Sequence, residues 1–271
     1  MSSTVPDPAA RLAVRIRAAR AERRCLPADD VENAVSPELA YRVQANVVAA
    51  REQGRATPAG WKLGYTSAVM REQMGIAEAN FGPLDRDMLL AHDCTIPESV
   101  IQPRVEPEIA LVLAADVPGS VDALAIRAFV RSAHAALEVV DSVWCGYRFT
   151  WAQNTADGSS AAFVVLGPEL DVTDLAVVPA MLERNGERVG SGFGAAAMGD
   201  PFAALAWLAE RLLERGQFLR AGQIVITGGL TAAVPFERGD TVSARIGSAL
   251  VTAHRSASGA EPTTAGDILV P

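Results

Sequence analysis

The feature that most constrains this chain is an apolar segment, residues 105–113, that carries Glu106 and Glu108 two positions apart. Side chains alternate across a β-strand, so both carboxylates would point to the same face. Ala110 and Val112 continue that face into apolar sequence. Neighbouring carboxylates repel each other, and burial disfavours their charged forms. The segment therefore predicts a half-buried strand in a sheet that must supply a partner for two charges.

A third acid, Glu138, lies in a similar setting between Leu137 and Val139. A hard divalent cation is a partner that such acids share readily, because Mg²⁺ and Mn²⁺ take carboxylate oxygens and Mg²⁺ usually keeps waters that a substrate can displace. The alternative is a solvated strand face, which is the commoner origin of a lone E-x-E pattern. The residues thus make Glu106, Glu108 and Glu138 candidate ligands of Mg²⁺ or Mn²⁺, with the solvated face still open.

Composition narrows the class of protein. The chain has 271 residues, 49% of them hydrophobic, and a net charge of −8. No basic patch interleaved with aromatic residues is present, which argues against a nucleic-acid partner. No apolar run is long enough for a membrane span, and arginines interrupt the N-terminal segment where a signal peptide would need an apolar core. We expect a cytoplasmic protein whose acidic substrate would need a local cation, either a metal or a buried lysine.

The cysteines and histidines are isolated. Cys25, Cys94 and Cys145 are far apart and form no C-x-x-C pair, which argues against a disulfide framework and against a thiolate zinc site. His134 falls in a segment, 121–135, for which we expect a helix, so a packing role is predicted for it.

Turn and cap residues divide the chain. Ser36 and Pro37 predict a helix start that Gly54 ends, and the Asn185-Gly186 pair predicts a two-residue hairpin. Short strands broken by Gly and Pro follow from Trp61 onward. We predict a helical N-terminal arm at 1–56, a catalytic domain at 57–255 and a tail at 256–271. The fold class is α+β, a helical arm followed by a curved mixed sheet with outer helices, because β and α segments do not alternate regularly.

Several segments, in order, resemble one family, the 2-keto-4-pentenoate hydratase / 4-oxalocrotonate decarboxylase group of the fumarylacetoacetate hydrolase superfamily. The matching segments are Gly60 to Ser67, Phe81 to Leu84, Pro103 to Ile109, Leu137 to Ser142, Ala156 to Ser160, Asn185-Gly186, Leu219 to Gly222 and Thr227 to Pro235. The resemblance implies a curved β-roll or barrel of the superfamily's C-terminal-domain type. It also implies a Mg²⁺ or Mn²⁺ ion on the three glutamates that chelates a small 2-oxo or 2-hydroxy-dienoic acid.

The resemblance also implies roles for other residues. Lys62 matches the family's active-site lysine; on its own, a lysine between Trp61 and Leu63 must find a partner, lower its pKa or snorkel to the surface. Ser160 matches the active-site serine. Ser159, Phe81 and Thr231 are expected to bind substrate.

Decarboxylase and hydratase activities both occur in this family. Hydratases carry an aspartate where this chain has Asn80, and an amide orients water but cannot accept its proton at neutral pH. The segments Thr227 to Pro235 and Tyr147 to Thr150 look more like the decarboxylase branch. We therefore expect a metal-dependent lyase that decarboxylates a 4-oxalocrotonate-type acid, with Lys62, Ser160 and Asn80 as catalytic residues and hydration of a 2-hydroxy-dienoate as the alternative.

Two departures from the family pattern are Val143 and Gly158, where the family usually has Arg and Asn, and they indicate a different substrate. A non-catalytic partner subunit and an acylpyruvase-type hydrolase that uses His134 are further alternatives. The family resemblance also implies a homo-oligomer, and a complex with a related hydratase or decarboxylase is a further option.

Overall fold

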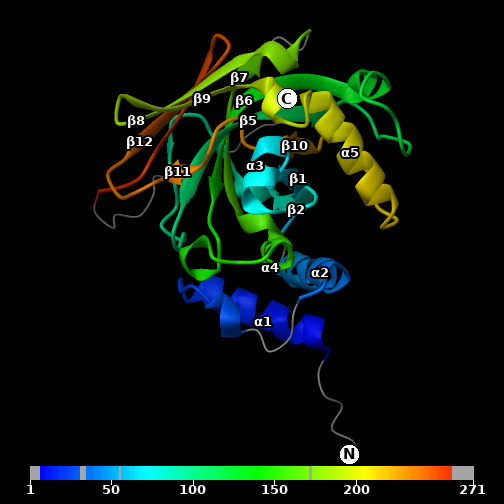
Figure 1. Ribbon diagram of the computed structural model, residues 1–271, viewed down its shortest axis with the longest axis vertical. Coiled ribbons are helices and arrows are strands. Elements are labelled where there is room, and N and C mark those ends of the chain that lie inside the picture. The colour runs from blue at the N-terminus through cyan, green and yellow to red at the C-terminus, as the bar shows by residue number, and fades with distance from the viewer. Residues whose placement is uncertain (1–6, 31–34, 55, 171–172, 258–271) are drawn as a thin grey trace, which may run out of the picture.

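The computed structural model describes residues 7–30, 35–54, 56–170 and 173–257 (Figure 1). Its α-helices are Pro8–Ala21 (α1), Pro37–Gln53 (α2), Ala68–Met74 (α3), Trp151–Ala156 (α4) and Pro201–Leu213 (α5). Its strands are Pro58–Gly64 (β1), Asn80–Asp85 (β2), Leu89–Ala91 (β3), Cys94–Thr95 (β4), Arg104–Leu113 (β5), Val130–Val140 (β6), Ala161–Leu170 (β7), Pro179–Arg184 (β8), Glu187–Phe193 (β9), Ile224–Ile226 (β10), Val234–Pro235 (β11), Thr241–Ile246 (β12) and Ala249–His254 (β13). The predicted tail lies outside the described residues from position 258 on.

Two sheets form the body of the molecule. The larger one runs in the order β2-β1-β10-β5-β6-β7-β3, with β11 also paired to β5, and the smaller one runs β4-β13-β12-β8-β9. Long curved strands β5, β6 and β7 lie beneath the smaller sheet, and α5 packs along one side (Figure 1). Ile109 and Leu111 of β5 and Leu137 of β6 are fully buried in the core between these layers. This is the α+β arrangement of a curved mixed sheet with outer helices that the sequence predicts.

Helix α2 begins at the cap predicted from the sequence. The Ser36 hydroxyl accepts a hydrogen bond from the backbone N–H of Leu39, with Pro37 in the first turn of α2. The carboxylate of Asp200 caps α5 in the same way. The predicted Asn185-Gly186 turn joins β8 to β9, and both residues have the positive φ that such a turn requires.

The helices of the N-terminal segment form a separate small core. Helices α1 and α2 lie together at one end of the molecule, next to α4 (Figure 1). Ile16 of α1 and Val43 of α2 pack in one apolar cluster with Trp144, which follows β6. This cluster joins the arm to the segment that leaves the main sheet after β6. No helix within the described residues is long and apolar enough to cross a membrane.

The helix predicted at 121–135 is wrong. Only Ala125–Phe129 is helical, as a short 3₁₀ turn, and Val130 already begins β6. The strand is sandwiched between β5 and β7 and buried on both faces, so its sequence shows no alternation that would distinguish it from a helix. His134 therefore lies on a strand, where its ring nitrogens contact the Ser132 hydroxyl and the Gly167 carbonyl.

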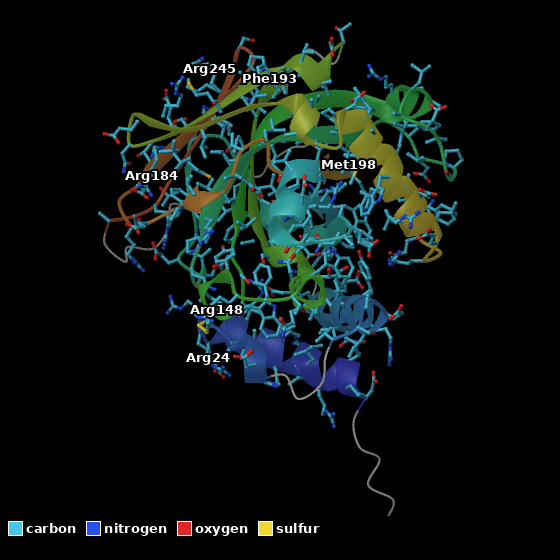
Figure 2. All side chains as sticks on the ribbon, in the orientation of Figure 1. Arg24, Arg148, Arg184, Phe193, Met198 and Arg245 are labelled. Atoms are coloured by element: carbon cyan, nitrogen blue, oxygen red, sulfur yellow. A yellow bond between two sulfur atoms is a disulfide. The ribbon has the colours of Figure 1, made fainter. Side chains whose placement is uncertain are left out.

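The expectation that the cysteines form no disulfide is also wrong. Cys25 and Cys145, which are 120 positions apart in sequence, form a disulfide with their Cα atoms 4.9 Å apart. A parallel bridge between Leu26 and Trp144 brings the two segments together. Figure 2 shows the sulfur atoms in yellow, between the labelled Arg24 and Arg148. Because this pairing depends on the docking of the arm, no local spacing in the sequence could reveal it.

Candidate active site

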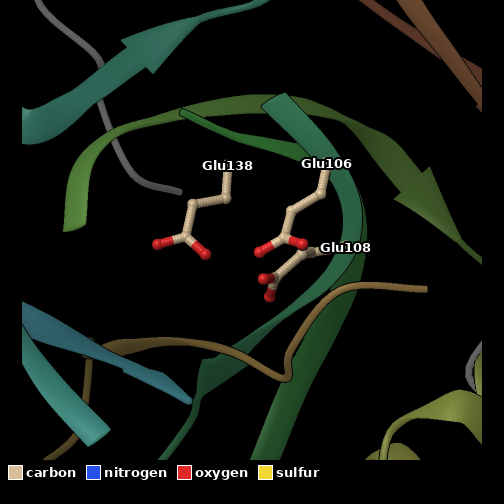
Figure 3. Close-up of side chains that lie close together, drawn as sticks. All are labelled: Glu106, Glu108 and Glu138. Carbon is tan, nitrogen blue, oxygen red and sulfur yellow. The ribbon is translucent and has the colours of Figure 1, made fainter. Parts of the chain in front are cut away.

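Strands β5 and β6 place three carboxylates around one point. Glu106 and Glu108 share a face of β5, and Glu138 stands directly opposite Glu106 in the antiparallel register of β6. One oxygen from each of the three side chains lies within 4.8 Å of the other two (Figure 3). The strand geometry predicted from the sequence thus brings all three candidate ligands together.

The environment of these acids fits a divalent cation. Glu108 and Glu138 are fully buried, and Oε1 of each lacks a hydrogen-bond partner among the described residues. Burial raises the pKa of Glu106 to about 8, with the nearby Glu138 charge adding to the shift, and it raises that of Glu108 well above its usual range. Buried carboxylates with free oxygens are stable when a cation shares them, so the donor set suits a hard metal ion.

Lys62 of β1 is the cation beside this cluster. Its Nζ lies 3.0 Å from Oε2 of Glu138 and donates to the carbonyl of Ser159 at 2.9 Å. Burial alone would lower the pKa of Lys62, but the charges of Glu138, Glu106 and Glu108 outweigh burial and raise it. The lysine is 3% exposed and does not snorkel to the surface. It is therefore a protonated cation inside the acidic cluster.

A tight turn carries the two serines. Residues Gly158–Ser160 follow α4, and Ser159 and Ser160 both adopt positive φ, at 57° and 59°. The Ser159 hydroxyl donates to Oδ1 of Asn80, and Nδ2 of Asn154 donates to the Ser160 hydroxyl. Both serines are nine-tenths or more buried, and each is held by an amide side chain rather than left loose in a loop.

Asn80 is fully engaged in this network. Its Nδ2 donates to Oδ1 of Asn154 at 3.0 Å and to the hydroxyl of Thr155 at 2.9 Å, while its Oδ1 accepts from Ser159. The amide is fully buried and does not line the pocket described below. Asn80 therefore holds Ser159 in place and does not itself contact a molecule bound in the pocket.

A pocket of about 160 Å³ opens over the acidic cluster. It is lined by Lys62, Leu63, Gly64, Tyr65, Thr66, Ser67, Glu106, Val140, Tyr147, Phe149, Asn154, Ser159, Ser160, Gly229, Thr231 and Ala233. Larger hollows lie between α1 and α2 and between α2 and the segment that follows α5, away from the three glutamates. The small pocket is the one that joins a cation, hydroxyl groups and the candidate metal ligands.

The structure separates the predicted substrate contacts. Thr231, Ser159 and Ser160 line the pocket, whereas Phe81 lies in the core against Tyr41 and Trp61. Val143, where the family usually has an arginine, is buried in the cluster formed with the arm and does not line the pocket. The valine at this position therefore does not itself contact a molecule bound in the pocket.

Two aromatic residues of the pocket wall, Tyr147 and Tyr65, were not predicted from the sequence as site residues. Tyr147 donates its hydroxyl to the Val140 carbonyl at 2.8 Å, and the Arg104 guanidinium lies 4.3 Å from the centre of its ring. Tyr65 follows β1 with φ of 57°, and Arg71 donates to its carbonyl. The aromatic Tyr147 to Phe149 segment was visible in the sequence, but nothing local indicated that it folds over the acidic strand.

Comparison with known proteins places this site in a family. Residues 28–256 match the model of the family described as Fumarylacetoacetate (FAA) hydrolase C-terminal. The chain is 35% identical over 243 residues to a 2-keto-4-pentenoate hydratase of Burkholderia vietnamiensis, covering 88% of this chain and 93% of that one. It is 31% identical over 241 residues to a 4-oxalocrotonate decarboxylase of a Pseudomonas species, covering 87% and 93%.

A solved structure agrees with the sequence matches. The 4-oxalocrotonate decarboxylase of Pseudomonas putida G7, complexed with magnesium and adipate, superposes with a TM-score of 0.87 at 29% identity, covering 94% of this chain and 100% of that one. The fold predicted from the family resemblance is confirmed. The chain belongs to the fumarylacetoacetate hydrolase C-terminal family.

Proposed function

We propose that this chain is a divalent-metal-dependent lyase that decarboxylates a small unsaturated 2-oxo diacid of the 4-oxalocrotonate type. The observation that carries the proposal is the composition of the pocket. Among its described lining residues, Glu106 supplies the one carboxylate and no histidine is present. Addition of water needs a group that steers or deprotonates it. Loss of CO₂ needs an electron acceptor and a cation, and this pocket is equipped for those.

The proposal assigns the metal to Glu106, Glu108 and Glu138. When bound there, Mg²⁺ or Mn²⁺ would act as a Lewis acid on the 1-carboxylate and the 2-oxo oxygen and make the 2-oxo group an electron acceptor. The magnesium and calcium complexes of the Pseudomonas putida G7 decarboxylase support a divalent ion in this fold. The raised pKa values and free oxygens of the buried glutamates support it from this chain itself.

Lys62 and the serines would act on the substrate directly. The C–C bond that joins the distal carboxylate group to the rest of the substrate breaks. Its electron pair passes through the conjugated double bond to the 2-oxo oxygen. That oxygen takes up a proton, which gives a 2-hydroxy-dienoate and CO₂. The ammonium group of Lys62 would stabilise the negative charge that develops during this step. The hydroxyls of Ser160 and Ser159 would orient the substrate.

Hydration of a 2-hydroxy-dienoate is the second candidate, favoured by the 35% identity to a named hydratase. Asn80 cannot act on water from its position, because both ends of its amide are bonded inside the network. We expect Asn80→Asp to give no hydratase activity and to destabilise the fold by about 1–3 kcal/mol, since two acceptors would then face each other at Asn154. Appearance of dienoate hydration in this variant would show that residue 80 selects the reaction.

The test of the main proposal is turnover by the purified chain with Mg²⁺. We expect 4-oxalocrotonate to lose its absorbance with release of one CO₂, and Glu108→Gln to lose Mg²⁺ affinity and turnover together. Hydration of a 2-hydroxy-dienoate without CO₂ release would select the hydratase alternative. Absence of both reactions with Mg²⁺ bound would select the non-catalytic subunit. The hydrolase alternative loses support, because His134 does not line the pocket.

Expectations about the domain division, the location and the assembly of the protein belong to the same proposal. The division into an arm at 1–56, a catalytic domain at 57–255 and a tail at 256–271 stays a prediction. So do the cytoplasmic location, the homo-oligomer and a complex with a related hydratase or decarboxylase. Size-exclusion chromatography with light scattering measures the oligomeric state, and co-purification with a related lyase tests the complex.

A further inference from the structure

The end of α1 contacts the catalytic turn through one residue. Arg20 donates from Nε and Nη2 to Oδ1 of Asp157, at 3.1 and 2.6 Å, and from Nη2 to the carbonyl of Asp141 at 3.1 Å. Asp157 immediately precedes the Gly158–Ser160 turn, and its carboxylate is buried. A residue of the N-terminal arm thus touches both the entrance of this turn and the end of β6.

The turn needs such support because its backbone is strained. Gly158, Ser159 and Ser160 all have positive φ, and for the two serines this region is costly, at about 1 kcal/mol or more each. Strained residues persist where the surrounding structure holds them firmly. Here the backbone N–H of Asp141 donates to the Ser160 carbonyl at 2.7 Å, and the N–H of Val143 donates to Oδ2 of Asp157 at 2.9 Å.

Arg20 ties these supports together. It binds Asp157 at one end of the turn and the carbonyl of Asp141, whose own N–H holds Ser160, at the other. Burial raises the pKa of Asp157 to about 6, and the Arg20 charge opposes that shift. Without the guanidinium, the buried carboxylate would lose the cation that is hydrogen-bonded to it. Arg20 therefore links the two ends of the turn and also pairs with the charge of Asp157.

We propose that Arg20 is a positioning residue, through which the N-terminal arm holds the Ser159 carbonyl against Lys62 and the Ser160 hydroxyl toward the bound 2-oxo acid. The inference rests on the proposed function for the identity of that acid. It gives the arm a part in the reaction although, among its described residues, none lines the pocket. Substitution of Arg20, which is far from the metal ligands in sequence, should then weaken substrate binding and leave metal binding intact.

The test uses the full-length chain and two calorimetric measurements, Mg²⁺ binding and then pyruvate binding to the Mg²⁺-saturated protein. Arg20→Gln should bind Mg²⁺ as the parent chain does and bind pyruvate at least about tenfold more weakly, equal to about 1.4 kcal/mol. Arg20→Lys keeps the charge but not the fork of donors, so it should recover part of the affinity. Turnover of 4-oxalocrotonate should fall more in Arg20→Gln than in Arg20→Lys.

The matched control is Arg42→Gln. Arg42 of α2 pairs with Asp7 at 2.8 Å on the exposed side of the arm, so this variant also removes an arginine–aspartate pair but makes no contact with the turn. Pyruvate affinity equal to that of the parent is expected. If Arg20→Gln does not fold, Asp157→Asn, which removes the other half of the pair, takes its place with the same expected loss.

The outcomes separate two failures. Pyruvate affinity in Arg20→Gln, or in Asp157→Asn, equal to that in Arg42→Gln would overturn the positioning role. Weakened pyruvate binding at unchanged Mg²⁺ affinity supports it, even if the parent chain turns over no 2-oxo acid, in which case the proposed function alone fails. A loss of Mg²⁺ affinity in Arg20→Gln would also contradict the inference, because the arm would then act on the metal site.

Discussion

At the scale of single residues, the positive charge of Lys62 offsets only part of the charge that the three buried acids can carry. Glu138 lies against Lys62, while Glu106 and Glu108 retain raised pKa values despite that lysine. One ammonium group does not neutralise three carboxylates. The carboxyl groups that the lysine does not balance hold their protons more strongly, and a divalent ion can take the place of those protons, so the metal-free protein is sensitive to pH.

That sensitivity has a definite sign. A carboxyl group whose pKa is higher in the folded than in the unfolded chain holds its proton longer when folded, so its contribution to stability is present at low pH and is lost as the pH rises. For Glu106 the loss extends from the ordinary glutamate range to about pH 8. We expect the EDTA-treated protein to melt at a lower temperature at pH 8 than at pH 6. Added Mg²⁺ should raise the melting temperature more at pH 8.

The control for this prediction is Glu106→Gln, which removes one of the titrating groups. Its EDTA-treated form should show a shallower fall in melting temperature over the same range. A larger effect of Mg²⁺ at pH 6 than at pH 8 would contradict the assignment of the ion to these carboxylates, because protons compete with the metal for the same oxygens.

Lys62→Met tests the cation itself. The substitution removes the partner of Glu138, so the metal-free protein should lose about 3–5 kcal/mol of stability, as expected when one half of a buried pair is removed. Mg²⁺ should restore much of this loss. Turnover with Mg²⁺ bound should nevertheless fall about 100-fold or more, because charge stabilisation at the reacting group is gone. Full turnover in the metal-bound variant would make Lys62 a structural residue.

At the scale of elements, β1 must approach the catalytic turn closely. A Cβ atom built on Gly64 would lie 2.3 Å from Oδ1 of Asn80 and 2.4 Å from Oγ of Ser159. Those two atoms are themselves hydrogen-bonded to each other. The absence of a side chain at the end of β1 is therefore what allows the serine turn and β2 to meet over the lysine.

Gly64→Ala should separate Asn80 from Ser159. We expect a stability loss of about 1–3 kcal/mol from overpacking, together with a larger fall in pyruvate affinity than in Mg²⁺ affinity, since the glutamate ligands lie on other strands. Denaturant unfolding and calorimetry measure the two effects. Gly54→Ala, at a helix end where φ is −78°, is the control and should leave both affinities unchanged. Unaltered pyruvate binding in Gly64→Ala would show that the contact is not needed.

Elements with local signals were predictable from the sequence. The Ser36 cap and the Asn185-Gly186 hairpin need only a few adjacent residues, and the strand period alone placed Glu106 and Glu108 on one face. The strand that begins at Val130 was missed because burial on both faces removes its alternation.

Contacts between distant segments could not be read from any local pattern. The register that sets Glu138 opposite Glu106 and the approach of Arg20 to Asp157 each join residues more than 30 positions apart. The wall formed by Tyr147 and Phe149 depends in the same way on a loop returning over β5. The candidate ligands were therefore predictable as a set, whereas the network that orients the serines was not.

At the scale of the whole molecule, the arm and the sheet are joined by the Cys25–Cys145 disulfide. A disulfide typically contributes about 2–4 kcal/mol, largely by restricting the unfolded chain. Reduction with dithiothreitol should therefore lower the melting temperature by roughly 5–15 °C. Cys94→Ser, which alters a cysteine outside the disulfide, should respond to dithiothreitol as the parent does. An unchanged melting temperature on reduction would show that docking of the arm does not depend on the bond.

The same bond has a topological consequence. Lys62, Glu106, Glu108 and Glu138 all lie between the two linked cysteines, inside one covalent ring of the polypeptide. A single protease cut anywhere in that ring would leave the two fragments attached to each other. Nicked protein should run as one species on a non-reducing gel and as two after reduction. Before reduction, the lysine and the three glutamates would still belong to one covalently linked molecule.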